Sequence, residues 1–279
     1  MTLLDGKALA LKVKTAVYKE TETLARRPGL AVILVGEDPA SRVYVNGKKK
    51  DCADCGFYSE EHMLPEATTQ REMLDLVDEL NKRADIDGIL VQLPLPGHLD
   101  PEVVLNAIDP RKDVDCFHPQ NVGTMLIGGS GFLPCTPAGV MALLEEYGID
   151  PSGKHAVVLG RSNIVGKPMA MLLLEKNATV TICHSKTQNL AEICRQADIL
   201  VSAVGKIGTV SADMVKDGAV VIDVAMNRDT NGKLCGDVDA GVAEKVSYLT
   251  PVPGGVGPMT RAMLMRNTLH SAQCHQNLQ

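Results

Sequence analysis

The chain has 279 residues, of which 45% are hydrophobic and 22% are charged, and its formal net charge is −6. This length is sufficient for two domains of ordinary size, each with its own core. The mildly acidic balance argues against a nucleic-acid-binding or membrane-surface role, and no hydrophobic run is long enough to span a bilayer.

Helices and strands alternate in the first half of the chain. Hydrophobic periodicity predicts helices over residues 7–25 and 39–55 and around Val77 and Leu80, with strands at 30–35 and 88–92. The second strand ends sharply at the proline-rich turn Leu93–Gly97. We expect the Gly- and Pro-rich region from Asp109 to Thr136 to be irregular. Strands separated by helices predict a parallel sheet, with functional sites at the carboxyl ends of its strands.

A second α/β series begins at about residue 150. Its strands are predicted at residues 155–159, 178–183, 199–204, 219–223 and 247–249. A hairpin turn is expected at Asp229–Gly232, with Asn231 and Gly232 supplying positive φ angles. The segment Thr250–Pro258 contains too much proline and glycine for regular structure, and it leads into a last helix from Met259 to about Gln273.

The segment Gly160-Arg-Ser-Asn-Ile-Val-Gly166 follows a hydrophobic run and opens a helical one. It therefore predicts a strand, a glycine turn and a helix whose N-terminal N–H groups can hold a phosphate. The spacing departs from G-x-G-x-x-G, because Ser162 replaces the second glycine and the last glycine comes one residue late. A similar turn that binds no nucleotide, with Arg161 in solvent, is the alternative.

The following strand ends in His184-Ser-Lys-Thr187, without the carboxylate that would accept the ribose 2′-hydroxyl of NAD. Ser185, Lys186 and Arg161 instead suit a 2′-phosphate, since arginine binds phosphate through two parallel hydrogen bonds. The cofactor predicted from these residues is NADP.

Tyr44 and Lys48 are four residues apart on a predicted helix, so their side chains share one face. An aromatic ring beside an amine suits a flat heterocycle next to a reacting carbon. Lys49 and Lys50 are rotated away and are expected in water, and the alternative for Lys48 is the same solvated stripe. The pair also occurs in short-chain dehydrogenases, but it follows the nucleotide fold there, whereas here it precedes the glycine turn.

Cys52 and Cys55 form a C-x-x-C pair, which is found in redox and metal sites. No second pair has zinc-ligand spacing, and this pair closes a helix before Gly56. We therefore interpret both cysteines as small buried side chains, and we predict no metal site. The N-terminus has no secretory pattern, so we expect a cytoplasmic protein with reduced thiols.

Five segments, in order along essentially the whole chain, resemble the methylenetetrahydrofolate dehydrogenase/cyclohydrolase family. They are Tyr44–Lys48, Gly88–Pro96, Lys112–Asp115 with Phe117–Pro119, Val158–Pro168 and Pro251–Thr260. The resemblance implies oxidation of 5,10-methylenetetrahydrofolate by NADP⁺ and hydrolysis of the methenyl product to 10-formyltetrahydrofolate. It also implies a homodimer that binds tetrahydrofolate derivatives.

The resemblance carries roles onto particular residues. Lys48 is similar to the catalytic amine, Tyr44 to the ring that stacks on folate, Gln92 to the partner of Lys48, and Asp115 to the carboxylate that grips the pterin. The family's NADP contacts match Gly160, Arg161, Ser162, Ser185 and the backbone of Met226. A base role for Lys48 requires a depressed pKa, which burial and a cationic substrate would favour.

Asp115 without the resemblance would be interpreted as an ordinary loop or cap aspartate. One position departs from the family pattern, because Cys116 follows this aspartate where glycine is common. Glycine permits backbone angles that cysteine resists, so we expect a slightly different turn around Asp115.

The predicted fold class is α/β with two domains and an active-site cleft between them. Residues 1–117 would form the catalytic domain and residues 118–279 a Rossmann-like NADP-binding domain with a mostly parallel sheet. The last helix, at about 259–275, would pack back on the first domain. Three alternatives stay open: a monofunctional dehydrogenase, a two-domain reductase similar to shikimate dehydrogenase, and a regulator that binds NADP or folate without turnover.

Overall fold

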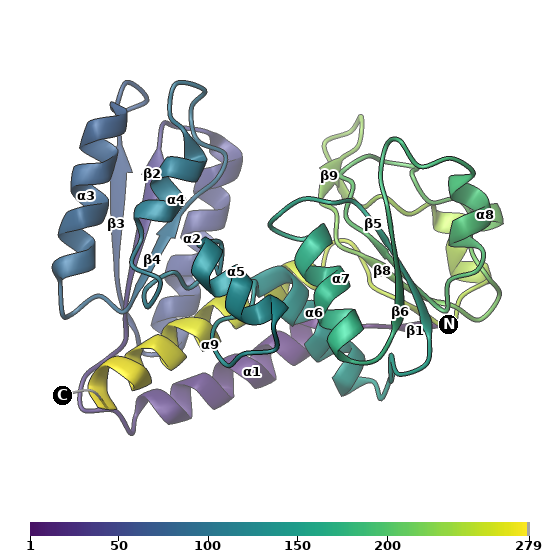
Figure 1. Ribbon diagram of the computed structural model, residues 1–279, viewed down its shortest axis with the longest axis horizontal. Coiled ribbons are helices and arrows are strands. Elements are labelled where there is room, and N and C mark those ends of the chain that lie inside the picture. Colours follow the sequence, from purple (N-terminus) through teal and green to yellow (C-terminus); the bar gives the residue numbers. More distant parts are fainter. Residues whose placement is uncertain (278–279) are drawn as a thin grey trace. The chain divides into compact units, whose positions relative to one another are not determined.

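The computed structural model describes residues 1–277, which divide into two compact units (Figure 1). Unit 1 contains Met1–Ala10 and Pro134–Thr260, and unit 2 contains Leu11–Leu133 with the chain from Arg261 onward. The limits fall inside helices α1 (Gly6–Thr21) and α9 (Val256–Asn277). Each unit thus combines segments that are distant in the sequence.

Unit 2 is built on a three-stranded parallel sheet in the order β3-β2-β4. The central strand is buried along its whole length, as its continuous apolar sequence predicts for a strand covered on both faces. Helix α3 begins with a capping box between Thr69 and Glu72 and buries Met73, Val77 and Leu80 in the core beside this sheet. The elements are β2 (Gly29–Val35), α2 (Pro39–Asp54), β3 (Tyr58–Leu64), α3 (Gln70–Lys82), β4 (Gly88–Val91), α4 (Pro101–Ala107) and α5 (Pro119–Leu126).

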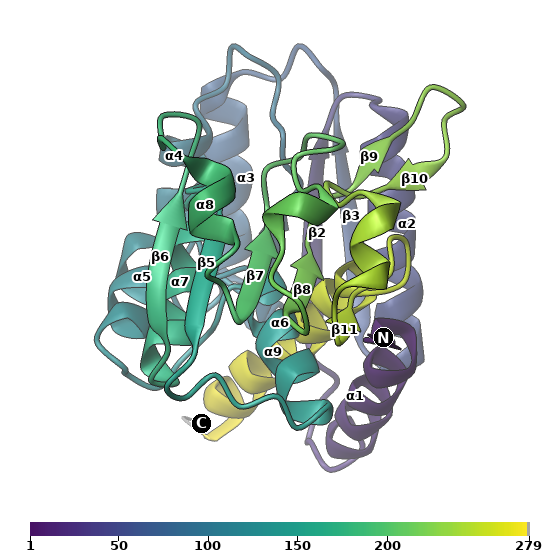
Figure 2. The same ribbon diagram turned by 90° about the vertical axis from the view of Figure 1, so that its right-hand side faces the viewer.

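Unit 1 contains a six-stranded sheet in the order β1-β11-β8-β7-β5-β6, in which every neighbouring pair is parallel. Figure 2 shows the arrows of β6, β5, β7 and β8 pointing in the same direction. The chain passes from β5 outward to β6 and then returns to the other side of β5 as β7, which makes the fold Rossmann-like. The strands are β1 (Thr2–Leu3), β5 (His155–Leu159), β6 (Thr179–Cys183), β7 (Ile199–Ser202), β8 (Val220–Asp223) and β11 (Tyr248–Leu249).

The remaining elements of unit 1 cover this sheet or extend from its edges. A small antiparallel hairpin pairs Leu234 with Arg228 and Cys235 with Asn227. Apolar residues of the strands, including Val157, Leu200 and Val221, are fully buried in one core. The elements are α6 (Cys135–Glu146), α7 (Gly166–Glu175), α8 (Leu190–Cys194), η1 (Ala212–Met214), β9 (Asn227–Arg228), β10 (Leu234–Cys235) and η2 (Ala240–Glu244).

The strands predicted from hydrophobic runs are all present, with ends that move by one or two residues. The expectation of an irregular region from Asp109 to Thr136 was wrong, because helix α5 lies within it. Pro119 occupies the first turn of that helix, and the imidazole of His118 accepts a hydrogen bond from the Gln120 N–H at 3.1 Å. These are local N-terminal signals that the Gly and Pro content of the region concealed.

Two turn predictions also need correction. In the hairpin at Asp229–Gly232 only Gly232 has a positive φ, of 76°, because the connection is longer than two residues and the Gly232 N–H closes a turn onto the Asp229 carbonyl. Helix α9 begins at Val256 rather than Met259. Pro258 is tolerated there because the first helical turn has N–H groups without intrahelical partners.

A buried carboxylate fixes the C-terminal part of α9 within unit 2. Asp87 is fully buried, and its oxygens lie 2.6 and 2.7 Å from the two terminal nitrogens of Arg26. The Asp87 carboxylate also accepts from the Gly29 N–H at 2.9 Å and lies 2.9 Å from Nδ1 of His275. The hydroxyl oxygen of Ser271 lies 2.7 Å from the carbonyl oxygens of both Asp87 and Arg111 and can donate its one proton to either, so α9 is tied to the end of the loop before β4.

No helix among residues 1–277 combines the length and the hydrophobicity that crossing a membrane would require.

We expect Arg26→Met to lower the free energy of unfolding by about 3 kcal/mol, because it leaves the buried Asp87 carboxylate without its bidentate partner. This loss lies at the lower end of the range for broken buried pairs, since Arg26 is itself partly exposed. Urea titration followed by circular dichroism would measure the loss. Arg71→Met, which removes an exposed pair with Asp75, is the matched control and should change stability by less than about 1 kcal/mol.

Candidate functional site

Helix α2 brings Tyr44 and Lys48 to one face and places Lys48 against the end of β4. The Lys48 Nζ donates to Oε1 of Gln92 at 2.9 Å, and Gln92 directly follows β4. The Nε2 of Gln92 donates to the Leu93 carbonyl at 2.7 Å, so the amide oxygen is the atom that faces the amine. The structure therefore joins two predicted site residues that are 44 positions apart in the sequence.

Lys48 is less exposed to solvent than the two lysines that follow it. Lys48 is half-buried, whereas Lys49 and Lys50 are exposed, which confirms that these two lysines face water. Tyr44, one turn before Lys48, is 39% exposed and so presents part of its ring at the surface of unit 2. An exposed aromatic face beside a held amine is an arrangement suited to a planar ligand.

A buried ion-pair cluster fixes α2 against α1 and α9. Asp51, one turn after Lys48 on α2, is buried and lies 2.7 Å from Lys14 of α1 and 3.2 Å from Nε of Arg261 in α9. The guanidinium of Arg261 also covers Gly47, where an added Cβ would lie 2.1 Å from Nη1. A side chain at residue 47 would therefore displace the end of the Arg261 guanidinium from its position against α2.

Asp115 lies in a turn that a neighbouring carboxylate organises. The chain before this turn pairs with β4 through a parallel bridge between Ile89 and Asp113. Asp113 is buried, and its carboxylate accepts from the N–H groups of Phe117 and His118 at 3.1 and 2.8 Å. Asp115 itself is half-buried. Asp113 thus fixes the loop that presents Asp115, a role the sequence pattern did not reveal.

Lys112 is a buried amine with a structural role in the same segment. Its Nζ donates to the carbonyls of Leu80 and Arg83 at 3.0 and 2.6 Å, where helix α3 ends. Burial lowers the pKa of Lys112 below its ordinary value, and the nearby Asp109 carboxylate opposes this shift only in part. The amine thus supplies a charged donor to two carbonyls at the end of the helix, where regular intrahelical donors run out.

Cys116 adopts the backbone conformation that glycine would favour. Its φ is 61°, in the left-handed region, and its N–H donates to the Asp113 carbonyl at 3.0 Å. The side chain is fully buried, and its Sγ donates to the Phe132 carbonyl at 3.2 Å. The turn is therefore closed in a glycine-like form with cysteine present, and the buried contact of the sulfur offsets part of the backbone strain.

The two cysteines of the C-x-x-C pair are buried and form no disulfide with each other, which confirms their interpretation as small core side chains. Cys52 and Cys55 are both fully buried free thiols, and Gly56 with φ of 74° follows the end of α2. Burial raises the pKa of each thiol to about 12. A neutral thiol is a poor nucleophile and a poor metal ligand. Within residues 1–277, no group of three or more His, Cys, Asp or Glu side chains is arranged to hold a metal ion.

The glycine turn of unit 1 connects β5 to helix α7 as predicted. Gly160 has a φ of 112°, and an added Cβ would lie 2.5 Å from the Ala203 carbonyl oxygen. At Gly166, the first residue of α7, a Cβ would lie 2.2 Å from the Gly160 carbonyl oxygen. The Ser162 hydroxyl accepts from the N–H groups of Val165 and Gly166 at 3.2 and 3.3 Å, so Ser162 shapes the turn itself. Both glycines are required by close backbone approach.

The predicted nucleotide residues lie on loops at one edge of the unit 1 sheet. Because β5, β6, β7 and β8 are parallel, their carboxyl ends meet at this edge. Gly160, Arg161 and Ser162 follow β5, Ser185 follows β6, and Met226 follows β8. Arg161 and Ser185 are exposed there, as contact with a phosphate would require. The glycine cradle and the exposed donors fit a dinucleotide with a 2′-phosphate.

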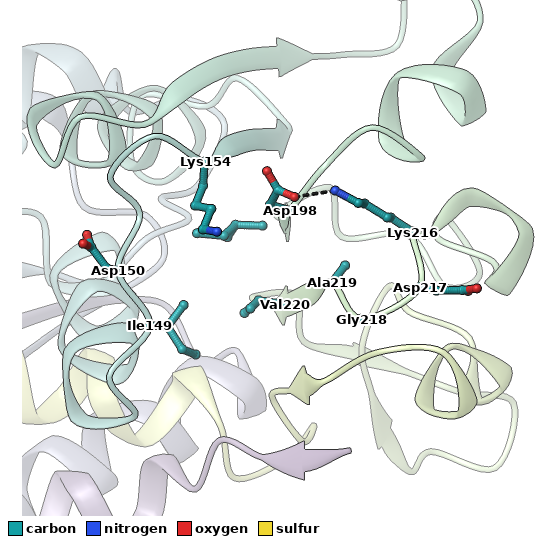
Figure 3. Close-up of a pocket in the computed structure, with 10 residues that line it drawn as sticks. Ile149, Asp150, Lys154, Asp198, Lys216, Asp217, Gly218, Ala219 and Val220 are labelled. Carbon is teal, nitrogen blue, oxygen red and sulfur yellow. Dashed lines mark hydrogen bonds and ion pairs between the residues drawn. The ribbon is translucent and has the colours of Figure 1, made fainter.

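A separate hollow lies at the opposite edge of the same sheet (Figure 3). Its volume is about 290 Å³, and Lys154, Ile199 and Val220 line it at the amino ends of β5, β7 and β8. Its charges partly neutralise one another, since Lys216 lies 2.5 Å from Asp198. The hollow is thus not the nucleotide edge of the sheet.

Fold and site together define an α/β protein with two units. One has a Rossmann-like fold, and the other carries a lysine whose amine is hydrogen-bonded to a glutamine side chain. Residues 4–115 match the family model for the tetrahydrofolate dehydrogenase/cyclohydrolase catalytic domain, and residues 134–276 match that for its NAD(P)-binding domain. The chain belongs to the tetrahydrofolate dehydrogenase/cyclohydrolase family.

Individual relatives agree over nearly the full length. The bifunctional protein FolD of Acetivibrio thermocellus is 60% identical over 275 residues, which cover 97% of this chain and 96% of that protein. The crystal structure of the bifunctional FolD enzyme from Campylobacter jejuni has a TM-score of 0.97 at 52% identity, covering 98% and 99% of the two chains. A Trypanosoma brucei FolD structure complexed with NADP and an inhibitor has a TM-score of 0.94 at 41% identity, covering 98% and 97%.

We expect iodoacetamide at pH 8 to alkylate Cys274 in the folded protein at least about a hundredfold faster than Cys52 or Cys55. Cys274 is exposed, whereas burial and a pKa of about 12 suppress the thiolate of the other two. Peptide mass spectrometry over a time course would give the three rates. The same reaction in guanidinium should equalise them, and fast labelling of Cys52 in the folded state would favour a reactive pair.

Proposed function

We propose that this protein oxidises 5,10-methylenetetrahydrofolate to the methenyl compound with NADP⁺ and hydrolyses the methenyl compound to 10-formyltetrahydrofolate. The observation that carries the proposal is the 2.9 Å hydrogen bond from Lys48 to Gln92, in a chain that belongs to this family over nearly its full length. Bound NADP⁺ would accept a hydride from the methylene carbon. The residues of the chain would align the substrate with the nucleotide and would donate and accept protons in the hydrolytic step.

In the hydride step the residues of unit 2 would hold the folate. Tyr44 would stack on its planar ring, and the Asp115 carboxylate would accept N–H donors from the pterin edge. Unit 1 would hold the nucleotide through five residues, which are Gly160, Arg161, Ser162, Ser185 and the Met226 backbone. Precise alignment of the reacting carbons can lower the barrier by roughly 7–11 kcal/mol.

In the hydrolytic step Lys48 would move protons at the methenyl carbon. Water adds to this carbon and loses one proton to give a neutral hydroxyl adduct. One carbon–nitrogen bond then breaks as its nitrogen takes up a proton, and the hydroxyl loses its remaining proton to become the formyl carbonyl on the other nitrogen, so that one proton is released overall. The fixed amide oxygen of Gln92 holds the amine of Lys48 in position by accepting a hydrogen bond from it. A cationic substrate beside the amine would favour its neutral form, which can accept a proton.

We further propose that the protein acts in the cytoplasm as a homodimer and contributes one-carbon units to purine, methionine and histidine synthesis. The folate chemistry supports the pathway assignment, and closed two-fold dimers are the commonest soluble homo-oligomers. Analytical ultracentrifugation would test the oligomeric state.

We expect Lys48→Ala to lower methenyltetrahydrofolate hydrolysis at least about a hundredfold, which is the typical contribution of a positioned acid–base group. Hydride transfer should fall less, because nitrogen lone pairs of the substrate assist it. Stopped-flow absorbance of the methenyl compound would follow both steps. Lys49→Ala, at the exposed neighbour, should stay within about twofold of the wild type. Equal loss of both steps would contradict separate roles.

We expect Ser185→Asp to raise the KM for NADP⁺ at least about tenfold, since a carboxylate repels the 2′-phosphate, and to improve the use of NAD⁺. Initial dehydrogenase rates with each nucleotide would show the change in preference. Ser152→Asp places the same charge on an exposed turn before β5 and should leave both constants unchanged. An unaltered NADP⁺ KM in the Ser185 variant would exclude this residue from the phosphate site.

A further inference from the structure

Unit 1 contains a fully buried carboxylate that the proposed reaction does not use. Asp237 has no exposed surface, and five hydrogen-bond donors converge on it. Its Oδ2 accepts from Ser202 Oγ at 2.8 Å and from the N–H groups of Val204 at 2.9 Å and Gly205 at 3.2 Å, and its Oδ1 accepts from the Lys206 N–H at 2.7 Å and Asn227 Nδ2 at 3.1 Å.

The donors come from the ends of two neighbouring strands. Three backbone N–H groups belong to the loop 203–208 after β7, and Asn227 follows the loop 224–226 after β8. A carboxylate offers about four acceptor positions, so this one is saturated. A single buried anion therefore holds both loops, and the five donors offset the cost of burying its charge.

A second buried carboxylate holds Asp237 in place. Asp223, the last residue of β8, accepts from the N–H groups of Asp237 and Val238 at 3.1 and 2.9 Å and from that of Ala225 at 3.2 Å. A Cβ at Gly236 would lie 1.9 Å from Oδ2 of Asp223, so glycine is needed for this approach. Burial raises the pKa of Asp223. The segment 236–238 is thus locked to the end of β8, and Figure 2 shows the hairpin β9–β10 beyond the arrowheads of β7 and β8.

The position of these loops relates them to the cofactor. A dinucleotide binds across the carboxyl edge of such a sheet where the strand order reverses, which is between β5 and β7 here. The glycine turn after β5 and Ser185 after β6 account for the phosphates and the adenosine half. The loops after β7 and β8 are then those that face the nicotinamide half.

We propose that Asp237 is a positioning residue for the dehydrogenase step, which holds the loops 203–208 and 224–226 in the conformation that receives the nicotinamide half of NADP⁺. The proposal rests on the proposed function. It assigns to Asp237 no contact with the cofactor, because its oxygens are occupied by the protein's own donors. Without this carboxylate the two loops would become ordered only when the nucleotide binds. The entropy lost in ordering them would then subtract from the binding free energy.

The test is the Asp237→Asn variant. It replaces one carboxylate oxygen, which accepts hydrogen bonds, by an amide NH₂ group, which would point its own N–H bonds at the donors of the two loops. We expect the Kd and the KM for NADP⁺ to rise at least about tenfold. Hydrolysis of methenyltetrahydrofolate without nucleotide, which uses residues of unit 2, should stay within about twofold of the wild type. Calorimetry would give the Kd, and absorbance assays would give the two activities separately.

Asp239→Asn is the matched control, because this exposed aspartate is two residues further along and its side chain makes no cap hydrogen bond. Its NADP⁺ binding should equal that of the wild type. A folded Asp237 variant with wild-type NADP⁺ affinity would overturn the proposal. A parallel fall in both activities and in the Tm would also overturn it, since it would show a general structural role.

A milder pair of variants applies if Asp237→Asn does not fold. Asn227→Ala removes one donor to Asp237, and Asn231→Ala in the exposed turn is its control. Only the first should raise the Kd for NADP⁺, by about threefold or more. A wild-type protein that binds NADP⁺ without oxidising methylenetetrahydrofolate would refute the proposed function, while the Kd comparison would still decide the role of Asp237. Absence of NADP⁺ binding in the wild type would overturn both.

Discussion

The shared direction of the strands is the constraint on which the rest of this structure depends. Every neighbouring pair in the two main sheets is parallel, so within each unit the loops that follow the strands gather at one edge. In unit 2 this brings Gln92, after β4, to Lys48 on the helix that follows β2. In unit 1 it aligns the glycine turn with the loops that carry Ser185 and Met226.

Buried aspartates convert this general arrangement into particular loop conformations. Asp113, Asp223 and Asp237 each accept from two or more backbone N–H groups, and each lies beside a loop rather than inside a helix. An ionised carboxylate is costly to bury unless such donors surround it. Each aspartate therefore specifies one arrangement of its donors, because another arrangement would leave the charge unsatisfied.

Side-chain packing also fixes the segments that carry the proposed site residues Lys48 and Asp115. The guanidinium of Arg261 lies over Gly47 of α2, where a side chain would displace it, and it shares the carboxylate of Asp51 with Lys14. Cys116 has a glycine-like φ of 61°, and its buried sulfur donates to the Phe132 carbonyl. Both positions show that the segments bearing Lys48 and Asp115 are held by residues that would not themselves touch a substrate.

The sequence by itself determined the α/β class, the positions of most strands, the glycine turn and the shared face of Tyr44 and Lys48. These features depend on local periodicity and on residue types that are close together in the chain. Only the tertiary structure decided the strand order, helix α5, and the burial of Asp87, Asp113 and Asp237. A charged residue in a sequence is ordinarily interpreted as exposed, and the donors that make its burial favourable come from segments up to 188 residues away, as His275 does for Asp87.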